Sequence, residues 1–194
     1  MVLFESVGLR YGDGPDILKD VSFALAPGSI HFLVGPSGSG KSSILKLIYR
    51  ALRPSAGRVS LFGRDLATVS HDELPDMRRR IGIVFQDFRL IEHLSTFENV
   101  ALTLRVRKVA EKEVWQHVGE LLHWVGLGDQ IGAAPPTLSG GQQQRAAIAR
   151  AVIGRPNLLI ADEPTGNVDD AMAVRLMYLF EELNRLGTTV LIAT

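Results

Sequence analysis

A glycine-rich stretch between two apolar runs constrains this chain more than any other feature. The stretch reads Gly35-Pro36-Ser37-Gly38-Ser39-Gly40-Lys41-Ser42 and fits the pattern G-x-x-x-x-G-K-[ST] at every position. The run at residues 30–34 before it is typical of a buried strand, and apolar residues recur at helical spacing over residues 42–52. A strand, a glycine-rich loop and a helix in this order predict an α/β fold around a parallel sheet.

The residue types in this loop suit the phosphates of a nucleotide. Glycines let the backbone curl so that successive N–H groups face phosphate oxygens, and the following helix directs its positive end at the same place. Lys41 is expected to reach the β- and γ-phosphates, and the Ser42 hydroxyl is expected to bind Mg²⁺. Residues 35–42 with Ser43 are therefore the candidate phosphate site. An accidental glycine-rich turn is the alternative, and the strand and helix around the loop disfavour it.

Two carboxylates follow a second apolar run. Residues 158–161 (Leu-Leu-Ile-Ala) predict a central strand, and Asp162 and Glu163 stand at its carboxyl end, where α/β sheets place ligand chemistry. Mg²⁺ prefers oxygen ligands, so Asp162 is a candidate metal partner. Glu163 is a candidate to polarise an attacking water. The alternative is a solvated acidic pair at the end of a strand.

A second candidate anion site reads Leu138-Ser139-Gly140-Gly141-Gln142. It places a hydroxyl and glycine N–H groups at the start of a predicted helix over residues 143–153. A chain that already holds its phosphates in one loop seldom needs another, so this segment is expected to serve the nucleotide of a second subunit. A plain serine N-cap is the alternative.

The remaining pattern predicts an N-terminal part of short strands and a helical insertion at about residues 90–155. Strands are expected at residues 2–9, 17–25, 58–62, 81–85 and 188–194, and helices at residues 109–125 and 170–186. A further helix is expected from about Leu94, with Ser95 or Thr96 as its N-cap and Glu98 in its first turn. Gly126 is expected to end the helix at residues 109–125.

Composition excludes several classes of protein. Lys and Arg together number 21, as do Asp and Glu, so there is no basic excess of the kind that a nucleic-acid partner requires. The chain has no cysteine, which excludes disulfides, thiolate catalysis and cysteine-bound zinc. No run approaches the roughly 20 apolar residues that cross a bilayer. A role at a membrane would therefore require another chain as its anchor.

Taken together and in order, these segments resemble the ATPase cassette of the ABC family across essentially the whole chain. The resemblance implies a single domain with a RecA-like parallel core and an N-terminal antiparallel part (residues 1–88 and 156–194) and a helical signature insertion (residues 89–155). It implies binding and hydrolysis of ATP with Mg²⁺ by a head-to-tail homodimer. It also implies that Tyr11 stacks on adenine, that Gln86 contacts Mg²⁺ or water, and that Asp169 faces the other subunit. From the residues alone, Asp169 is equally a helix N-cap.

Within the family, the segments at residues 85–90 (Phe-Gln-Asp-Phe-Arg-Leu), 94–100 and 163–169 resemble the FtsE group of bacterial cell-division ATPases. This resemblance implies an FtsX-like integral membrane partner, a peripheral position at the cytoplasmic face of the inner membrane, and control of peptidoglycan hydrolases. The alternatives are a lipoprotein-release or macrolide-export ATPase, a soluble ABC protein, a non-hydrolysing binding module and, least favoured, a phosphate-loop kinase.

One position of the family pattern is missing from the sequence. The switch histidine of the family follows a strand that resembles residues 189–194, and the sequence ends at Thr194. None of the five histidines (His31, His71, His93, His117 and His123) occupies that place. The C-terminal switch region is therefore expected to be absent. Because the switch histidine helps to hold the γ-phosphate, hydrolysis by these 194 residues is expected to be weak.

Overall fold

Two four-stranded sheets carry the fold in a computed structural model that describes residues 1–194. The antiparallel sheet has the order β2-β1-β4-β5 and contains β1 (Val2–Arg10), β2 (Asp16–Leu25), β4 (Ala56–Leu61) and β5 (Arg64–Asp65). The parallel sheet has the order β3-β8-β7-β6 and contains β3 (Ile30–Leu33), β6 (Ile81–Val84), β7 (Leu158–Asp162) and β8 (Thr189–Ala193). The predicted α/β class, with an antiparallel N-terminal part and a parallel core, is confirmed.

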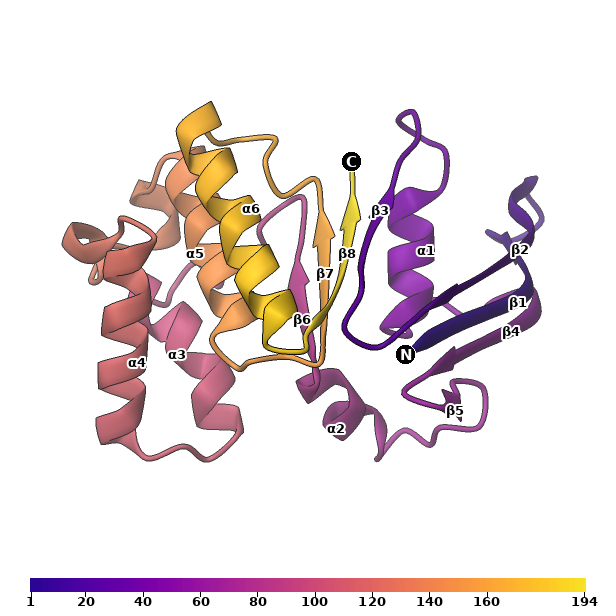
Figure 1. The fold of residues 1–194 in the computed structure, drawn as a ribbon, viewed down its shortest axis with the longest axis horizontal. Coiled ribbons are helices and arrows are strands. Elements are labelled where there is room, and N and C mark those ends of the chain that lie inside the picture. Colours follow the sequence, from indigo (N-terminus) through magenta and orange to yellow (C-terminus); the bar gives the residue numbers. More distant parts are fainter.

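Helices cover the parallel sheet on both sides (Figure 1). Helix α1 lies between this sheet and the antiparallel sheet, whereas α5 and α6 lie on the opposite side, with α3 and α4 beyond them. The helices are α1 (Lys41–Ile48), α2 (Leu74–Arg79), α3 (Thr96–Val106), α4 (Glu111–Trp124), α5 (Gly140–Val152) and α6 (Asp170–Arg185). Short 3₁₀ turns at Gly128–Gln130 and Pro135–Thr137 lead into α5.

Alternating side chains of β7 and β8 join two hydrophobic cores. Leu158 and Ile160 pack with α1 and the antiparallel sheet, whereas Leu159 and Ala161 pack with α5 and α6. Successive residues of a strand point to opposite faces, so a strand that is apolar throughout is buried on both sides. A third core lies within α3, α4 and α5 and includes Val100. The parallel sheet therefore holds the carboxyl ends of β3 and β7, with their following loops, at one edge.

The predicted helix boundaries are largely confirmed. Ser95 is the N-cap of α3, and its backbone N–H donates to Oε2 of Glu98 at 2.8 Å while its hydroxyl accepts from the backbone N–H of Glu98. Thr96, the other candidate, instead donates its hydroxyl to the carbonyl of Ala133. Helix α4 ends just before Gly126, whose φ of 71° is the left-handed conformation of a helix end.

Three details differ from the prediction. The helix expected to reach Leu52 ends at Ile48, because Arg50 adopts a left-handed conformation and the guanidinium of Arg78 donates to the carbonyl of Tyr49. The strand expected over residues 30–34 ends at Leu33. Helix α2 and strand β5 are not apparent in the sequence pattern, since elements of six and two residues are too short to show a period.

No helix of the chain combines the length and the apolar character that crossing a membrane requires.

The close approach of α5 to the parallel sheet depends on Gly82 of β6. A Cβ atom added there would lie 2.3 Å from the carbonyl oxygen of Ala151 in α5. We expect Gly82→Ala to lower the free energy of unfolding in urea by about 2–3 kcal/mol, because the helix must move away from the sheet. Gly8→Ala on β1 is the matched control, since its nearest contact would be an ordinary 3.4 Å. Equal stability of the two variants would show that α5 does not need this approach.

Candidate functional site

The glycine-rich loop joins β3 to α1 and depends on glycine at its last turn. Gly40 precedes the first residue of α1 with a φ of 94°, and a Cβ atom there would lie 2.8 Å from a methyl carbon of Leu18. Gly38 has a φ of 81°. Both angles are in the region that only glycine adopts at little cost. The loop can therefore turn sharply into α1, whose first N–H groups have no partner within the helix.

The Lys41 side chain lies against this loop and is buried. Its Nζ donates to the carbonyl of Gly35 at 2.6 Å and to that of Pro36 at 3.3 Å. Its ammonium group is thus held at the mouth of the loop by two neutral acceptors. A phosphate oxygen brought to the same place would be a charged and stronger acceptor.

A cavity of about 210 Å³ opens beside the loop. Three side chains from elsewhere in the chain, Ile17, Gln86 and Glu163, line it. The loop and the start of α1 contribute the rest of the lining, namely Ser37, Gly38, Gly40, Lys41, Ser42 and Ser43. The structure therefore brings both predicted catalytic side chains, Gln86 and Glu163, to the candidate phosphate site.

Glu163 occupies a strained position directly after β7. Its φ of 49° is left-handed, which is costly for a residue with a side chain, and its backbone N–H donates to the carbonyl of Ala193 at 2.9 Å. The Gln86 amide donates to Oε2 of Glu163 at 3.4 Å. Gln86 lies two residues after the end of β6, and Glu163 directly follows the neighbouring strand β7. Because Val84 of β6 pairs with Ala161 of β7, the register of the two strands aligns Gln86 with Glu163.

A second cavity, of about 420 Å³, contains all three predicted magnesium ligands. Ser42, Gln86 and Asp162 line it, and Ser42 and Gln86 line the loop cavity as well. The chain has no cluster of three His, Cys, Asp or Glu residues that could hold a metal ion alone. One carboxylate, one hydroxyl and one amide oxygen nevertheless suit Mg²⁺ that is shared with phosphate oxygens, since Mg²⁺ takes few protein ligands in such sites.

Tyr11 lies near the start of α1, although it follows β1 in the sequence. Its hydroxyl and that of Ser43 share a hydrogen bond of 3.1 Å, and 44% of its surface is exposed. The structure thus places an accessible aromatic ring at the border of the candidate phosphate site.

The segment at residues 138–142 begins α5. Ser139 is the N-cap and accepts from the backbone N–H of Gln142, and the Gln142 side chain accepts from the Ser139 N–H at 2.8 Å. Leu138 is buried, whereas Ser139 and Gly140 are exposed. None of residues 138–142 lines either cavity beside the glycine-rich loop. Ser139 is therefore an N-cap, and the exposed end of α5 is also accessible to another molecule.

Asp169 is the N-cap of α6, as expected from the sequence, and accepts from the N–H of Met172 at 2.9 Å. Asp169 is exposed. Capping uses one carboxylate oxygen, so the same side chain can still meet a second subunit.

Sequence reasoning missed the buried residue that fixes α5 to the end of β7. The Gln144 amide is fully buried and donates to the carbonyl of Pro164 at 2.6 Å, while its oxygen accepts from Asn167. The helical period could have revealed it, because Gln144 shares a face with the buried residues Ile148 and Ala151. Gln144 thereby positions the loop that carries Glu163.

Arg150, near the other end of α5, was also missed. Its guanidinium donates to the carbonyls of Phe88 at 2.7 Å and Arg89 at 2.5 Å, two consecutive residues with left-handed φ angles. Burial lowers the pKa of Arg150 from its usual value. Helix α5 therefore holds the strained loop after Gln86 as well as the loop that carries Glu163.

Comparisons with known proteins agree with this geometry. Residues 18–166 match the family model described as ABC transporter. The chain belongs to this family. It is 45% identical to the cell division ATP-binding protein FtsE of Escherichia coli K12, over all of this chain and 87% of that protein. It is 42% identical to the FtsE protein of Bacillus subtilis, over all of this chain and 85% of that protein. The predicted resemblance to the ABC ATPases and to their FtsE group is confirmed.

The fold agrees equally well. A dimeric, post-hydrolysis structure of the ATP-binding cassette MJ0796 bound to ADP and Pi superposes with a TM-score of 0.93 and 35% sequence identity, over all of this chain and 88% of that one. The chain is thus an ABC-type ATPase that binds and hydrolyses ATP.

The buried amide of Gln144 provides the first test of the site. We expect Gln144→Leu to lower the free energy of unfolding by about 2–3 kcal/mol, because the Pro164 carbonyl loses its buried donor. ATP turnover should fall roughly tenfold with ATP affinity unchanged, since only the loop of Glu163 is displaced. Gln116→Leu, which removes an exposed hydrogen bond to Glu120, is the control for both measurements. A Gln144→Leu variant with parental stability and turnover would refute this role.

Proposed function

We propose that this chain is the ATP-hydrolysing subunit of a membrane complex that acts in bacterial cell division. It works as a head-to-tail homodimer, and an FtsX-like integral membrane protein holds it at the cytoplasmic face of the inner membrane. Its output is control of peptidoglycan hydrolases. The names of the FtsE relatives support the cell-division role, and the dimeric MJ0796 cassette supports the dimer.

The observation that carries the dimer proposal is that residues 138–142 line neither cavity beside the glycine-rich loop. The glycine-rich loop has its own cavity, and the exposed end of α5 takes no part in it. In a head-to-tail dimer, each ATP lies between residues 35–42 of one copy and residues 138–142 of the other. The γ-phosphate completes both contacts, so ATP favours the closed dimer and hydrolysis removes that preference.

Within each copy, we assign roles to residues that share the two cavities. Lys41 and the loop N–H groups bind the phosphates, and Ser42, Asp162 and Gln86 hold Mg²⁺, which supplies charge neutralisation when it is bound. Glu163 accepts a hydrogen bond from the attacking water, and the Gln86 amide orients that carboxylate. Tyr11 stacks on the base and Asp169 faces the second copy. Residues 1–88 and 156–194 form the core of a single ATPase domain, and residues 89–155 form its helical subdomain.

The head-to-tail arrangement is tested by mixing two defective chains. Both chains carry Glu163→Gln, which slows hydrolysis. One chain also carries Lys41→Ala, which removes the loop contact, and the other carries Ser139→Arg, which blocks the end of α5. Neither chain by itself should dimerise when ATP is added. A mixture should form dimers that retain about one ATP each, because a mixed dimer keeps one intact site of two. The measurement is light scattering after size-exclusion chromatography, with nucleotide quantified in the dimer peak.

Absence of dimers from the mixture, while the Glu163→Gln parent dimerises, would show that the two segments do not meet across an interface. Absence of dimers from the parent itself would place assembly under the control of the membrane partner.

The role of Tyr11 has a separate test. Tyr11→Phe keeps the ring and should keep the affinity for ATP, whereas Tyr11→Ala should weaken it about 5- to 30-fold by losing the stacking surface. Titration with a fluorescent ATP analogue measures the affinity of each variant. An equal loss in Tyr11→Phe would assign the effect to the hydrogen bond with Ser43 rather than to the ring.

A further inference from the structure

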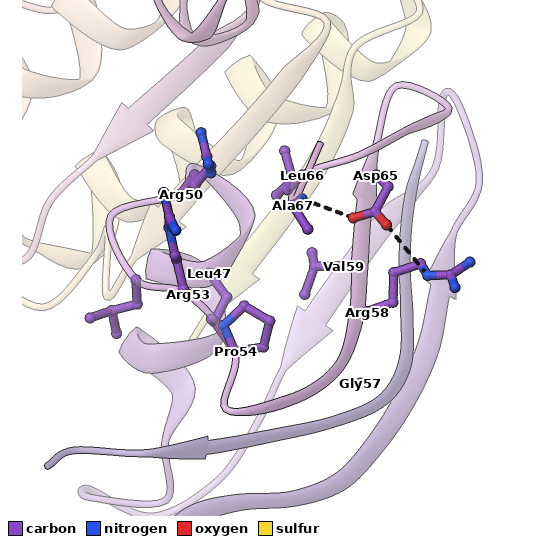
Figure 2. A pocket seen from close by; sticks show the side chains of 11 residues that line it. Leu47, Arg50, Arg53, Pro54, Gly57, Arg58, Val59, Asp65, Leu66 and Ala67 are labelled. Atoms are coloured by element: carbon purple, nitrogen blue, oxygen red, sulfur yellow. Dashed lines mark hydrogen bonds and ion pairs between the residues drawn. The ribbon is translucent and has the colours of Figure 1, made fainter. Parts of the chain in front are cut away.

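A cavity of about 230 Å³ lies between the end of α1 and the hairpin of β4 and β5 (Figure 2). It shares no lining residue with either cavity of the nucleotide site. Its floor reaches the hydrophobic core, because Leu47, Val59 and Leu66 line it and are buried members of that core. Binding of ATP therefore does not account for this cavity.

Three arginines line the cavity, together with a single acidic residue. Figure 2 shows Arg50 and Arg53 on one side and Arg58 on the other, turned toward Asp65. Nε of Arg58 pairs with one carboxylate oxygen of Asp65 at 3.4 Å, and the other oxygen accepts from the Ala67 N–H at 2.8 Å. Asp65 is therefore engaged within its own hairpin and leaves the charges of Arg50 and Arg53 uncompensated.

Both of these arginines have donors to offer to a ligand. Arg53 is exposed and takes part in none of the seven ion pairs of the chain. Arg50 donates one N–H to the carbonyl of Val69 at 2.9 Å. A guanidinium group has five N–H donors, so this bond leaves most of them unused. The same side of the cavity therefore carries two positive charges and several free donors.

Compensation of the negative end of α1 is the ordinary role of a basic residue at a helix C-terminus, and other groups already perform it here. Carbonyls in the last turn of α1 accept from backbone N–H groups. Beyond that turn, Arg78 donates to the carbonyls of Tyr49 and Arg50 at 3.1 Å each. The helix end therefore does not explain why the side chains of Arg50 and Arg53 both stand at this cavity.

A charged side above an apolar floor is suited to a small organic anion. Guanidinium groups bind carboxylates and phosphates through pairs of parallel hydrogen bonds. Two uncompensated arginines match a dianion, and a phosphate monoester is mostly dianionic at neutral pH because its second pKa is about 6. The cavity volume of about 230 Å³ is smaller than the roughly 300–1,000 Å³ that drug-sized ligands occupy, so the body attached to the phosphate must be short.

We propose that this cavity binds a phosphate monoester with a small apolar body. The phosphate lies between Arg50 and Arg53, and the apolar body covers Leu47, Val59 and Leu66. The ligand thereby joins the end of α1 to the hairpin of β4 and β5. This site is independent of the proposed dimer and membrane partner. A soluble phosphate ester and the headgroup of phosphatidate present the same chemistry.

The test is a titration of the isotope-labelled chain with phenyl phosphate, followed by heteronuclear NMR. ADP and Mg²⁺ are present at saturating concentration, so that the phosphate loop cannot take the probe. The backbone amides of Ala67 and Val69 should shift with a Kd of about 0.1–1 mM, as expected for so small a ligand. Inorganic phosphate has no apolar body and should bind at least about tenfold more weakly.

Arg53→Gln should weaken binding of phenyl phosphate at least about tenfold, because a charge-assisted contact is lost, and its Tm should equal that of the parent. Arg175→Gln on α6 is the matched control. Arg175 is also exposed, takes part in no ion pair and does not line the cavity. Ala67→Leu keeps both arginines but fills part of the cavity, and it should weaken binding at least about threefold.

Sedimentation with vesicles separates the two sources of the ligand. Retention of the chain by phosphatidylcholine vesicles that contain phosphatidate, lost in Arg53→Gln, would assign the site to a lipid headgroup. Binding of phenyl phosphate without such retention would assign it to a soluble ester. Both results support a phosphate site between Arg50 and Arg53.

Three results would overturn the inference. The first is the absence of amide shifts up to about 10 mM phenyl phosphate, or equal affinity in the parent and in Arg53→Gln. The second is equal affinity for inorganic phosphate and phenyl phosphate, which would reduce the site to a surface contact for anions. The third is tighter binding of benzoate than of phenyl phosphate, which would assign the cavity to carboxylates.

Discussion

The arrangement of the candidate site depends on one buried amide that joins α5 to the end of β7. Gln144 donates to the carbonyl of Pro164 at 2.6 Å in a fully buried setting, where an unpaired carbonyl would cost about 1–3 kcal/mol. Gly82 lets the helix lie close enough to the sheet for this bond to form. Because the amide also accepts from Asn167, it fixes both the loop of Glu163 and the start of the turn toward α6.

The two loops that α5 supports contain three of the nine non-glycine residues with left-handed φ angles. Glu163 has a left-handed φ angle directly after β7, and Phe88 and Arg89 have left-handed φ angles in the loop after β6. Such conformations cost on the order of 1–3 kcal/mol each and persist only where the surroundings impose them. Gln144 and Arg150 provide those surroundings from one helix.

The sequence predicted the parts of the fold and of the site that depend on local backbone chemistry. The glycine-rich loop, the apolar strand before Asp162 and the Ser95 N-cap each require particular residue types at fixed spacing, and each lies where it was expected. Gln144 and Arg150 were missed because their partners are carbonyl groups, which every residue has, so nothing in the side chains of Pro164 or Phe88 indicates the contact. The grouping of Arg78, Arg79, Arg89, Arg107 and Arg150 around one cavity was missed for a related reason. These five arginines come from four segments of the sequence, and their charge is hidden in a net charge of zero.

The length of α5 gives a physical reason why one helix joins these features. It has 13 residues and spans about 20 Å from its N-cap, Ser139, to its last turn. Its N-terminal end is exposed at Ser139 and Gly140, its middle holds the loop of Glu163, and Arg150 holds the loop that follows Gln86. A helix packed on a sheet moves as a rigid body, because its core contacts do not deform continuously. A displacement of its first turn would therefore also reach Arg150 and the loop that Arg150 holds.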